Sequence, residues 1–420
     1  MKLRATLLAF SVLCSFAVPA AHAAGDQPYA GQTITVLLPP WGTLPKAMTD
    51  AFKAKTGITV DMQTQGWDQI HAKILTAMIA NNPPADVSEV DWSWVGQFGA
   101  AGWFEPLQGK VPAPVVQDIA SDKIFTIDGK LIAMPYNNDF RVLIVNKAMF
   151  DKAGITQMPT TMDELWADAV ALKKSGVTYP IALPLSANEG TSTAWYLLTK
   201  AFGGDLFDAS MKPEFTTPDS AGYKALDWIV KAAKAGLIDP ASTGLTDVQV
   251  QAFLSGGQAA IDLAGWAGNL TVYNDPSKSK VAGHVVAALM PSATGHSRSF
   301  GLPEALGIPA NAKHKGAALA FIDWWMQPAV QIEAYKALGD LPTSTAALSD
   351  LSKEGKLPSG DVLLKQIPTV EPLFAQGTPE WYPQFSAGVS SAINQAAKGQ
   401  LTVAQAIAQI AAQAKKAQSQ

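Results

Sequence analysis

The sequence has little cysteine, little charge and no excess of basic residues. It contains one cysteine in 420 residues, which excludes a disulfide framework and any metal site that needs several thiolates. Charged residues make up 16% and hydrophobic residues 48%, the reverse of the balance that keeps a chain disordered. With 31 Lys and Arg against 35 Asp and Glu, the net charge is −4. No basic surface is therefore expected for nucleic acid or an anionic membrane.

The sequence also lacks a hydrophobic run long enough to span a membrane. Its extended apolar stretch, Leu7 to Val18, has 12 residues, well short of the ~20 that a span needs. This stretch follows a positively charged start and precedes Ala21-His22-Ala23, a small-x-small cleavage site, so we interpret residues 1–23 as a secretory signal peptide. Cleavage would remove Cys14 and leave a cysteine-free chain, which suits an oxidising compartment such as the periplasm.

What is present, in the first part of the chain, is a regular alternation of strand and helix patterns. It predicts strands over 33–38, 59–63 and 86–90 and helices over 46–56 and 67–79. Gly57 provides a C-terminal stop for the first of these helices. Such alternation favours a parallel α/β sheet.

The alternation of strand and helix patterns is interrupted near residue 131. A strand over 143–145 closely follows 131–134 with no helix between them, which is typical of a chain passing from one lobe to another. Beyond it the sequence predicts short strands over 285–290 and 305–309 and helices over 161–172, 220–235, 247–254, 317–326 and from 381 to the end. Two of these helices carry a capping box, Thr161 with Glu164 and Thr402 with Gln405.

The motifs of enzyme chemistry are absent from the sequence. Neither Gly-x-Ser-x-Gly nor a phosphate-binding glycine motif occurs, and the five histidines show no His-x-x-x-His zinc spacing. Pairs of carboxylates, which glycosidases use, arise in any chain with 35 acids and so indicate nothing. We expect no enzymatic activity, no cofactor and no metal.

Several segments of the chain carry short motifs whose order and spacing are more specific than any one of them alone. They are Asn81–Val87, Ala101–Leu107, Asp128–Tyr136, Leu143–Ile155, Pro159–Leu165, Ala252–Ile261 with Gly265-Trp266, and Gly307–Pro309 with the helix after it. Together they resemble the bacterial solute-binding proteins of carbohydrate ABC transporters, the family that includes maltose-binding protein. The resemblance covers most of the chain after residue 23, and the run from Asp128 to Leu165 is its most specific part.

The resemblance implies an α/β fold of two lobes joined by crossing segments, with one ligand in the cleft between them. The lobes would close about this hinge, and the membrane permease would recognise the closed form. We expect a first lobe of residues 24–136 plus 285–340 and a second of 137–284 plus 341–420. The expected partners are a small carbohydrate or polyol and the permease subunits of an ABC transporter. Nucleic acid is not expected as a partner, and the protein is expected to be a monomer.

The chemistry of a sugar indicates which side chains such a cleft should contain. Its C–H faces stack on aromatic rings, and its hydroxyl groups suit Asp, Glu, Asn and Arg. These groups should lie just past the ends of strands, where open α/β sheets bind ligands. The candidates are Trp41, Asp91, Trp92, Trp94, Asn138, Asp139, Arg141, Trp195, Trp266, Glu304 and Trp381. The roles of Asp139, Arg141 and Trp266 follow from the resemblance. The acids taken together with Arg141 favour a neutral ligand.

Two other functions stay open at this point. The same fold could receive a polyamine-like cation between tryptophan faces and carboxylates, although Arg141 in the cleft argues against it. A secreted glycoside-active enzyme is the third possibility. The sequence does not choose between a monosaccharide, a larger sugar and a sugar alcohol.

Overall fold

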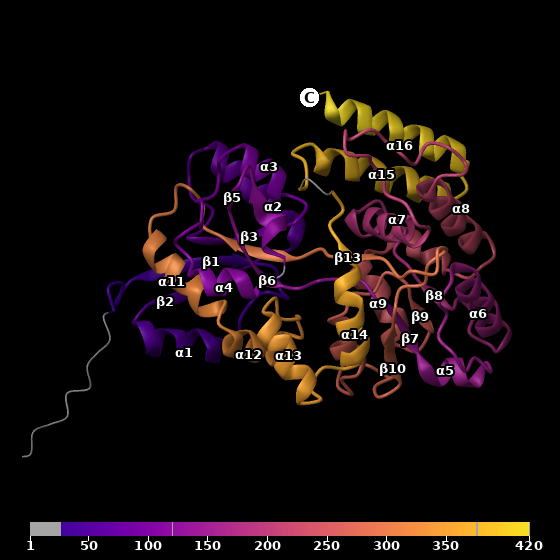
Figure 1. Ribbon diagram of the computed structural model, residues 1–420, viewed down its shortest axis with the longest axis horizontal. Helices are drawn as coiled ribbons and strands as arrows, with labels where there is room; N and C mark the ends of the chain where they lie inside the picture. The colour runs from indigo at the N-terminus through magenta and orange to yellow at the C-terminus, as the bar shows by residue number, and fades with distance from the viewer. Residues whose placement is uncertain (1–26, 120, 375–376, 420) are drawn as a thin grey trace, which may run out of the picture.

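The computed structural model describes residues 27–119, 121–374 and 377–419. The expected signal peptide, residues 1–23, lies outside them. Figure 1 shows two lobes side by side along the long axis, with chain segments crossing between them. Over the described ranges, no helix combines the length and apolar character that a membrane span requires.

The first lobe is built on a five-stranded sheet. Its strands, in spatial order, are β2 (Thr59–Thr64), β1 (Thr33–Leu38), β3 (Val87–Asp91), β12 (Glu304–Gly307) and β6 (Met134–Asn137). β1 pairs in parallel with β2 and β3, whereas β12 is antiparallel to both β3 and β6. The predicted parallel sheet is thus confirmed for β1 to β3, and the return strand β12 enters it in the opposite direction.

Local signals define the helices that accompany this sheet. α1 (Lys46–Thr56) and α2 (Trp67–Ile79) have the predicted bounds, and Gly57 ends α1 in the left-handed conformation with φ of 73°. The other helical segments of this region are α3 (Val95–Ala100), α4 (Ala113–Asp118), η1 (Asp122–Phe125), α11 (Lys315–Trp325) and α12 (Pro328–Leu338). A short hairpin joins β4 (Thr126–Ile127) to β5 (Lys130–Leu131).

The second lobe is built on a four-stranded sheet in the order β10 (Val285–Ala288), β7 (Leu143–Asn146), β9 (Ile261–Asp262), β8 (Ile181–Ala182). Its helical segments are α5 (Lys147–Lys152), α6 (Met162–Lys174), α7 (Glu189–Ala201), α8 (Ala221–Lys234), η2 (Pro240–Gly244), α9 (Asp247–Ser255), α10 (Asn269–Tyr273), α15 (Tyr382–Ala397) and α16 (Val403–Gln418). Figure 1 shows α15 and α16 along the upper side of this lobe, above α7 and beside α8.

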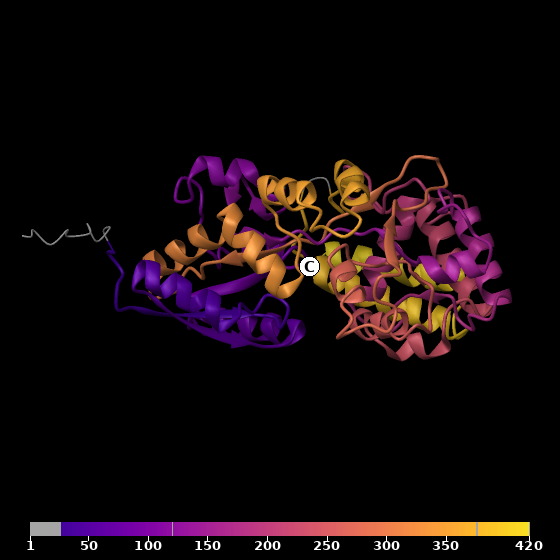
Figure 2. The ribbon, with the colours of Figure 1, turned by 90° about the horizontal axis from the view of Figure 1, so that it is seen from below.

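Three crossing segments, 138–141, 299–302 and 339–343, run between the lobes and are bonded to one another. The Asn138 amide donates to the Leu341 carbonyl at 2.9 Å, and the Leu302 amide donates to the Asp139 carbonyl at 2.6 Å. β11 (Ser299–Phe300) pairs in parallel with β13 (Val370–Glu371), which follows η3 (Ile367–Thr369). The lobes are therefore joined by a compact bundle of extended chain, visible near the centre of Figure 2.

A small hydrophobic core beside these crossings joins the helices before and after residue 340 to the second sheet. It contains Ile144 of β7, Val285 of β10, Tyr335 of α12, Leu348 of α13 (Thr345–Lys353) and Leu363 of α14 (Gly360–Gln366). One expected lobe boundary needs correction here. Residues 285–288 were placed in the first lobe, but β10 pairs with β7 in the second sheet, so the chain crosses after β10.

Candidate functional site

A cavity of about 400 Å³ lies between the two lobes, with walls from both. The first lobe contributes residues that follow β1, β2 and β3 or begin β12, and the second contributes the starts of α7, α9 and α10. The central part comes from the crossing segments. The lining residues are Trp41, Trp67, Asp68, Asp91, Trp92, Asn137, Asn138, Asp139, Arg141, Asn188, Glu189, Gly190, Thr193, Thr246, Asp247, Val248, Gln251, Trp266, Gly268, Asn269, Val272, Leu302, Glu304, Leu338, Gly339 and Asp340.

On the first-lobe wall, two carboxylates face each other across neighbouring strands. Asp91 ends β3 and Glu304 begins β12, and the antiparallel register pairs them directly. Indole N–H groups hold both in place: Trp41 Nε1 donates to the two Glu304 oxygens at 2.7 and 2.9 Å, and Trp67 Nε1 donates to Asp91 Oδ2 at 3.1 Å. This wall thus combines tryptophans with carboxylates that are fixed in position.

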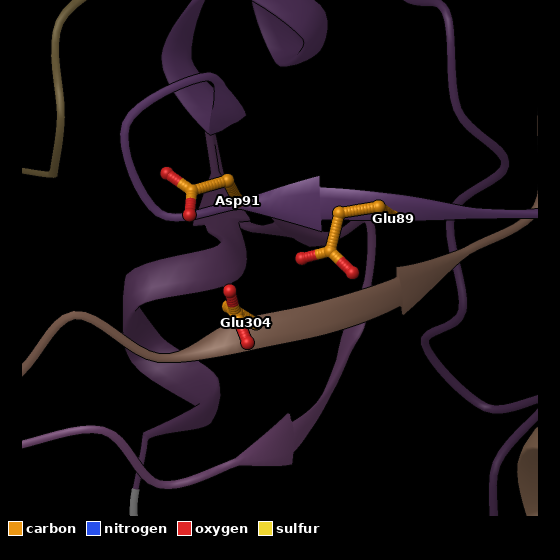
Figure 3. A group of neighbouring side chains, drawn as sticks. All are labelled: Glu89, Asp91 and Glu304. Carbon is orange, nitrogen blue, oxygen red and sulfur yellow. The ribbon is translucent and has the colours of Figure 1, made fainter. Parts of the chain in front are cut away.

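Behind this wall lies a third carboxyl group, Glu89, which is fully buried on β3. Figure 3 shows Glu89, Asp91 and Glu304 gathered where β3 and β12 run side by side, and one carboxyl oxygen of each lies within 4.8 Å of the other two. Tyr136 contacts Glu89 Oε2 at 2.9 Å and Glu304 Oε2 at 3.3 Å, while Glu89 Oε1 has no hydrogen-bond partner. Carboxyl groups this close raise one another's pKa, and their oxygens are near enough to contact one cation.

The crossing segment 138–141 contributes the one basic side chain of the lining, Arg141. This side chain is buried, its Nη2 lies 3.8 Å from Asp139 Oδ2, and its guanidinium carbon lies 4.9 Å from the ring centre of Trp266. A backbone bridge between Arg141 and Trp266 brings the two together. Arg141 is therefore already paired with an acid and stacked on an indole.

Acidic side chains outnumber basic ones in the lining by seven to one. The seven are Asp68, Asp91, Asp139, Glu189, Asp247, Glu304 and Asp340. This corrects the sequence-based expectation that neither sign would dominate. That expectation weighed only three acids, because the others reach the cleft from segments that showed no site signal.

Burial makes several of these carboxyl groups titrate near neutral pH. It raises the pKa of Asp91 to about 6, of Asp139 and Glu189 to about 7, and of Asp340 to about 8, the last also because Asp139 is close. Burial, together with the charges of Asp91 and Asp340, raises the pKa of Glu304 well above its usual value. At neutral pH the lining can therefore both donate and accept hydrogen bonds, as sugar hydroxyls require.

A second cavity, about 510 Å³, lies in the second lobe between Lys152, Tyr179 and Gln258. It contains no tryptophan and none of the residues that the sequence singled out. The interlobe cavity is the better candidate because it brings rings, carboxyl groups and amides together.

Comparison with known proteins adds the family. The profile of the bacterial extracellular solute-binding proteins matches residues 41–332, more than half of the chain. The chain belongs to this family. Among the relatives of this solute-binding protein, the diacetylchitobiose-binding protein DasA of Streptomyces coelicolor is 26% identical over 78% of this chain and 77% of its own. The mannitol-binding protein of Pseudomonas aeruginosa is 29% identical over 61% of each chain.

Solved structures share the two-lobe fold. A solute-binding protein of Agrobacterium radiobacter K84, solved with ribitol, superposes with a TM-score of 0.82 at 21% identity and covers 92% of this chain and 99% of its own. The maltose-bound MalE3 protein of T. maritima gives 0.80 at 21% identity, with the same coverage. At such identities the likeness concerns the fold alone.

The structure brings eight of the eleven candidate residues of this solute-binding protein to one cavity. They are Trp41, Asp91, Trp92, Asn138, Asp139, Arg141, Trp266 and Glu304. They come from three parts of the first sheet, from the crossing segments and from the loop before α10. Their convergence makes the cavity a single site.

The other three candidates, Trp94, Trp195 and Trp381, do not line the cavity, which corrects the prediction. Trp94 is buried against Trp67 and stacks on His71 with ring centres 4.9 Å apart. Trp195 is fully buried in α7 and donates from Nε1 to the Gly222 carbonyl at 2.7 Å. Trp381 precedes α15 and packs edge-on against Phe207, Phe374 and Phe385. Each of these three indoles therefore packs against residues of its own lobe.

The sequence analysis missed several lining residues. Trp67 follows β2 and Gly66, so the strand-end rule that selected Trp41 would have found it. Glu189 begins α7, where it accepts from the Tyr382 hydroxyl and from Ser386 Oγ at 2.7 Å. Asp340 follows Gly339, which ends α12 in the left-handed conformation. Nothing local to Glu189 or Asp340 signals the cleft, because only the arrangement of the lobes brings them there.

Proposed function

We propose that this protein is the substrate receptor of an ABC importer, which captures a sugar or polyol between its lobes and delivers it to the membrane permease. The observation that carries the proposal is the interlobe cavity, where Trp41, Trp92 and Trp266 stand among carboxyl and amide side chains. Its volume lies within the ~300–1,000 Å³ usual for small-molecule sites. The relatives DasA and the mannitol-binding protein are named for a sugar and a polyol, diacetylchitobiose and mannitol, which are ligands of this class.

The remaining parts of the proposal follow from this role. The eight converging candidates form the ligand contacts, and residues 1–23 form the leader that directs the chain to the periplasm. The lobes are those expected from the sequence, except that residues 285–298 are assigned to the second lobe, because β10 pairs with β7 and the Ser292 amide donates to the Thr160 carbonyl. The receptor acts as a monomer and returns its ligand chemically unchanged.

The test is calorimetric titration of the protein, without residues 1–23, against monosaccharides, disaccharides, hexitols, pentitols and spermidine. A thermal-shift screen can find the ligand first, because a ligand at about 100 times its Kd stabilises by ~2.7 kcal/mol. We expect a carbohydrate or polyol to bind and to be recovered intact by mass spectrometry. Binding of spermidine alone, or turnover of a glycoside, would contradict the proposal.

Trp266→Ala should weaken binding of that ligand at least about tenfold, or 1.4 kcal/mol, because a stacking face is lost from the wall. Trp195→Phe is the matched control, since Trp195 is buried away from the cavity. It should lower the melting temperature and leave the affinity as it was. Wild-type affinity in Trp266→Ala would show that the ligand sits elsewhere.

A further inference from the structure

We infer that the ligand is a sugar or polyol that carries a positively charged amine, which binds at the wall formed by Asp91, Glu304 and Asp340. This inference rests on the proposed function and specifies its substrate class. It starts from the imbalance of charge in the lining, where seven carboxyl groups stand against one guanidinium.

Arg141 does not balance the first-lobe acids. Its guanidinium lies beside Asp139. On the second-lobe side, burial raises the pKa of Asp247 and of Asp262, and the charge of Arg141 offsets part of that rise. By contrast, the charges that act on Glu304 are those of Asp91 and Asp340, and the charge that acts on Asp340 is that of Asp139. The first-lobe wall is therefore a group of acids whose charged neighbours are other acids.

Two carboxyl oxygens, one behind this wall and one on the crossing segment, lack a hydrogen-bond donor. Glu89 Oε1 is fully buried and has no hydrogen-bond partner, and the carboxyl groups of Asp91 and Glu304 lie beside it. Asp340 Oδ2, on the crossing segment, is likewise buried and unpartnered. A buried acceptor without a donor is unfavourable, and an ammonium group supplies up to three donors together with the opposite charge.

The aromatic side chains at this end suit the same ligand. Trp41, Trp67 and Trp92 all line the cavity, and the first two bind Glu304 and Asp91 through their indole N–H groups. An indole that holds a carboxylate by its edge can still offer its face to an ammonium or to the C–H face of a sugar. A neutral sugar would use the rings and the protonated carboxyl groups here, whereas an ammonium group would also take the place of the protons that these carboxyl groups hold.

The test compares matched ligand pairs that differ in one amine. The pairs are glucosamine with glucose, galactosamine with galactose, mannosamine with mannose, and glucamine with sorbitol, with N-acetylglucosamine as an uncharged amine derivative. In the pair that binds most tightly, the amine should have at least a tenfold lower Kd. Its binding should weaken as salt is added and should release protons, which calorimetry in buffers of different ionisation enthalpy detects.

Asp340→Asn keeps the shape of the side chain and removes its charge, so it should reduce the preference for the amine at least about threefold. Asp323→Asn is the control, because Asp323 is a half-buried acid on α11 that does not line the cavity. Equal or tighter binding of the hydroxyl members overturns the inference and leaves the proposed function standing. Binding by spermidine but by no sugar or polyol overturns both. If CaCl₂ raises the melting temperature and no amine is preferred, the wall formed by Asp91, Glu304 and Asp340 binds a metal ion instead, which overturns the inference.

Discussion

At the scale of single residues, Tyr136 shows how protons are distributed on the first-lobe wall. Its hydroxyl contacts Glu89 Oε2 at 2.9 Å and Glu304 Oε2 at 3.3 Å, yet it has one hydrogen to donate. One shared hydrogen cannot fully stabilise two buried negative charges, so a protonated carboxyl group at this place is favourable. Burial and the neighbouring acids raise the pKa of both Glu89 and Glu304, which favours that protonated form.

The raised pKa values predict how stability depends on pH. Asp340 has a pKa of about 8 in the folded protein against 3.8 as the ordinary value. Between these values the folded state holds a proton that the unfolded state has released, so the free energy of unfolding falls as pH rises from about 4 to about 8 and then levels off. Asp340→Asn removes this titration and should show a smaller decrease in melting temperature between about pH 5 and about pH 8.

The matched control for this measurement is Asp50→Asn, on the exposed side of α1. It should follow the wild-type profile. An equal loss of stability in wild type and Asp340→Asn would show that Asp340 does not titrate in this range. Measurements should be made without ligand, because a bound cation would itself change these pKa values.

Sequence reasoning selected eight residues that line the interlobe cavity, but three of its tryptophans lie elsewhere. Trp41 and Trp92 follow buried strands, so position along the chain was sufficient for them. Trp94 also follows β3, yet His71 of α2 provides a stacking partner that buries it. Trp195 is satisfied by the Gly222 carbonyl in another helix. Partners distant in the chain decide which indole is core and which is exposed to ligand, so no local rule separates them.

At the scale of elements, helix ends were the most predictable feature. The capping boxes of α6 and α16 are both present: Thr161 and Glu164 exchange hydrogen bonds at one helix start, as do Thr402 and Gln405 at the other. The signals for these ends lie within four residues, so they are legible in the sequence. The position of β12 in its sheet could not be read in this way, because its partners β3 and β6 come from a distant part of the chain.

The α16 cap gives a stability prediction. Thr402→Ala removes the side-chain acceptor for the Gln405 amide, seen at 3.2 Å, and should lower the free energy of unfolding by about 1 kcal/mol. The midpoint of urea unfolding measures this change. Thr402→Ser, which keeps the hydroxyl, should stay close to wild type. An equal loss in both variants would mean that the methyl group, rather than the cap, matters.

At the scale of the whole molecule, the site is divided between two lobes that are joined by the crossing segments and by the small core beside them. Trp41 and Glu304 belong to the first lobe and Asp247 to the second, while Asp139 and Arg141 lie on the crossing itself. A ligand that contacts both walls stabilises the arrangement in which they are closest. The receptor function therefore predicts hinge closure when ligand binds.

Small-angle X-ray scattering tests this closure. The radius of gyration should decrease when the protein is saturated with the ligand found by titration. Trp266→Ala, at a ligand concentration that saturates only the wild type, should keep the larger radius. An unchanged radius in the wild type, with binding confirmed by calorimetry, would show that the lobes do not move.

The place of β12 between β3 and β6 governs the order in which the chain can fold. Trp41 and Glu304, which share two hydrogen bonds, are 263 residues apart, and the middle of the first sheet is open until β12 arrives. A nascent chain that ends before residue 304 would leave the facing edges of β3 and β6 without their shared neighbour, although all four strands of the second sheet would already be present. Synthesis from the N-terminus thus completes the second sheet before the first. Contacts between segments distant in the chain form slowly. The late arrival of β12 therefore keeps the N-terminal half of the chain incompletely folded for longer.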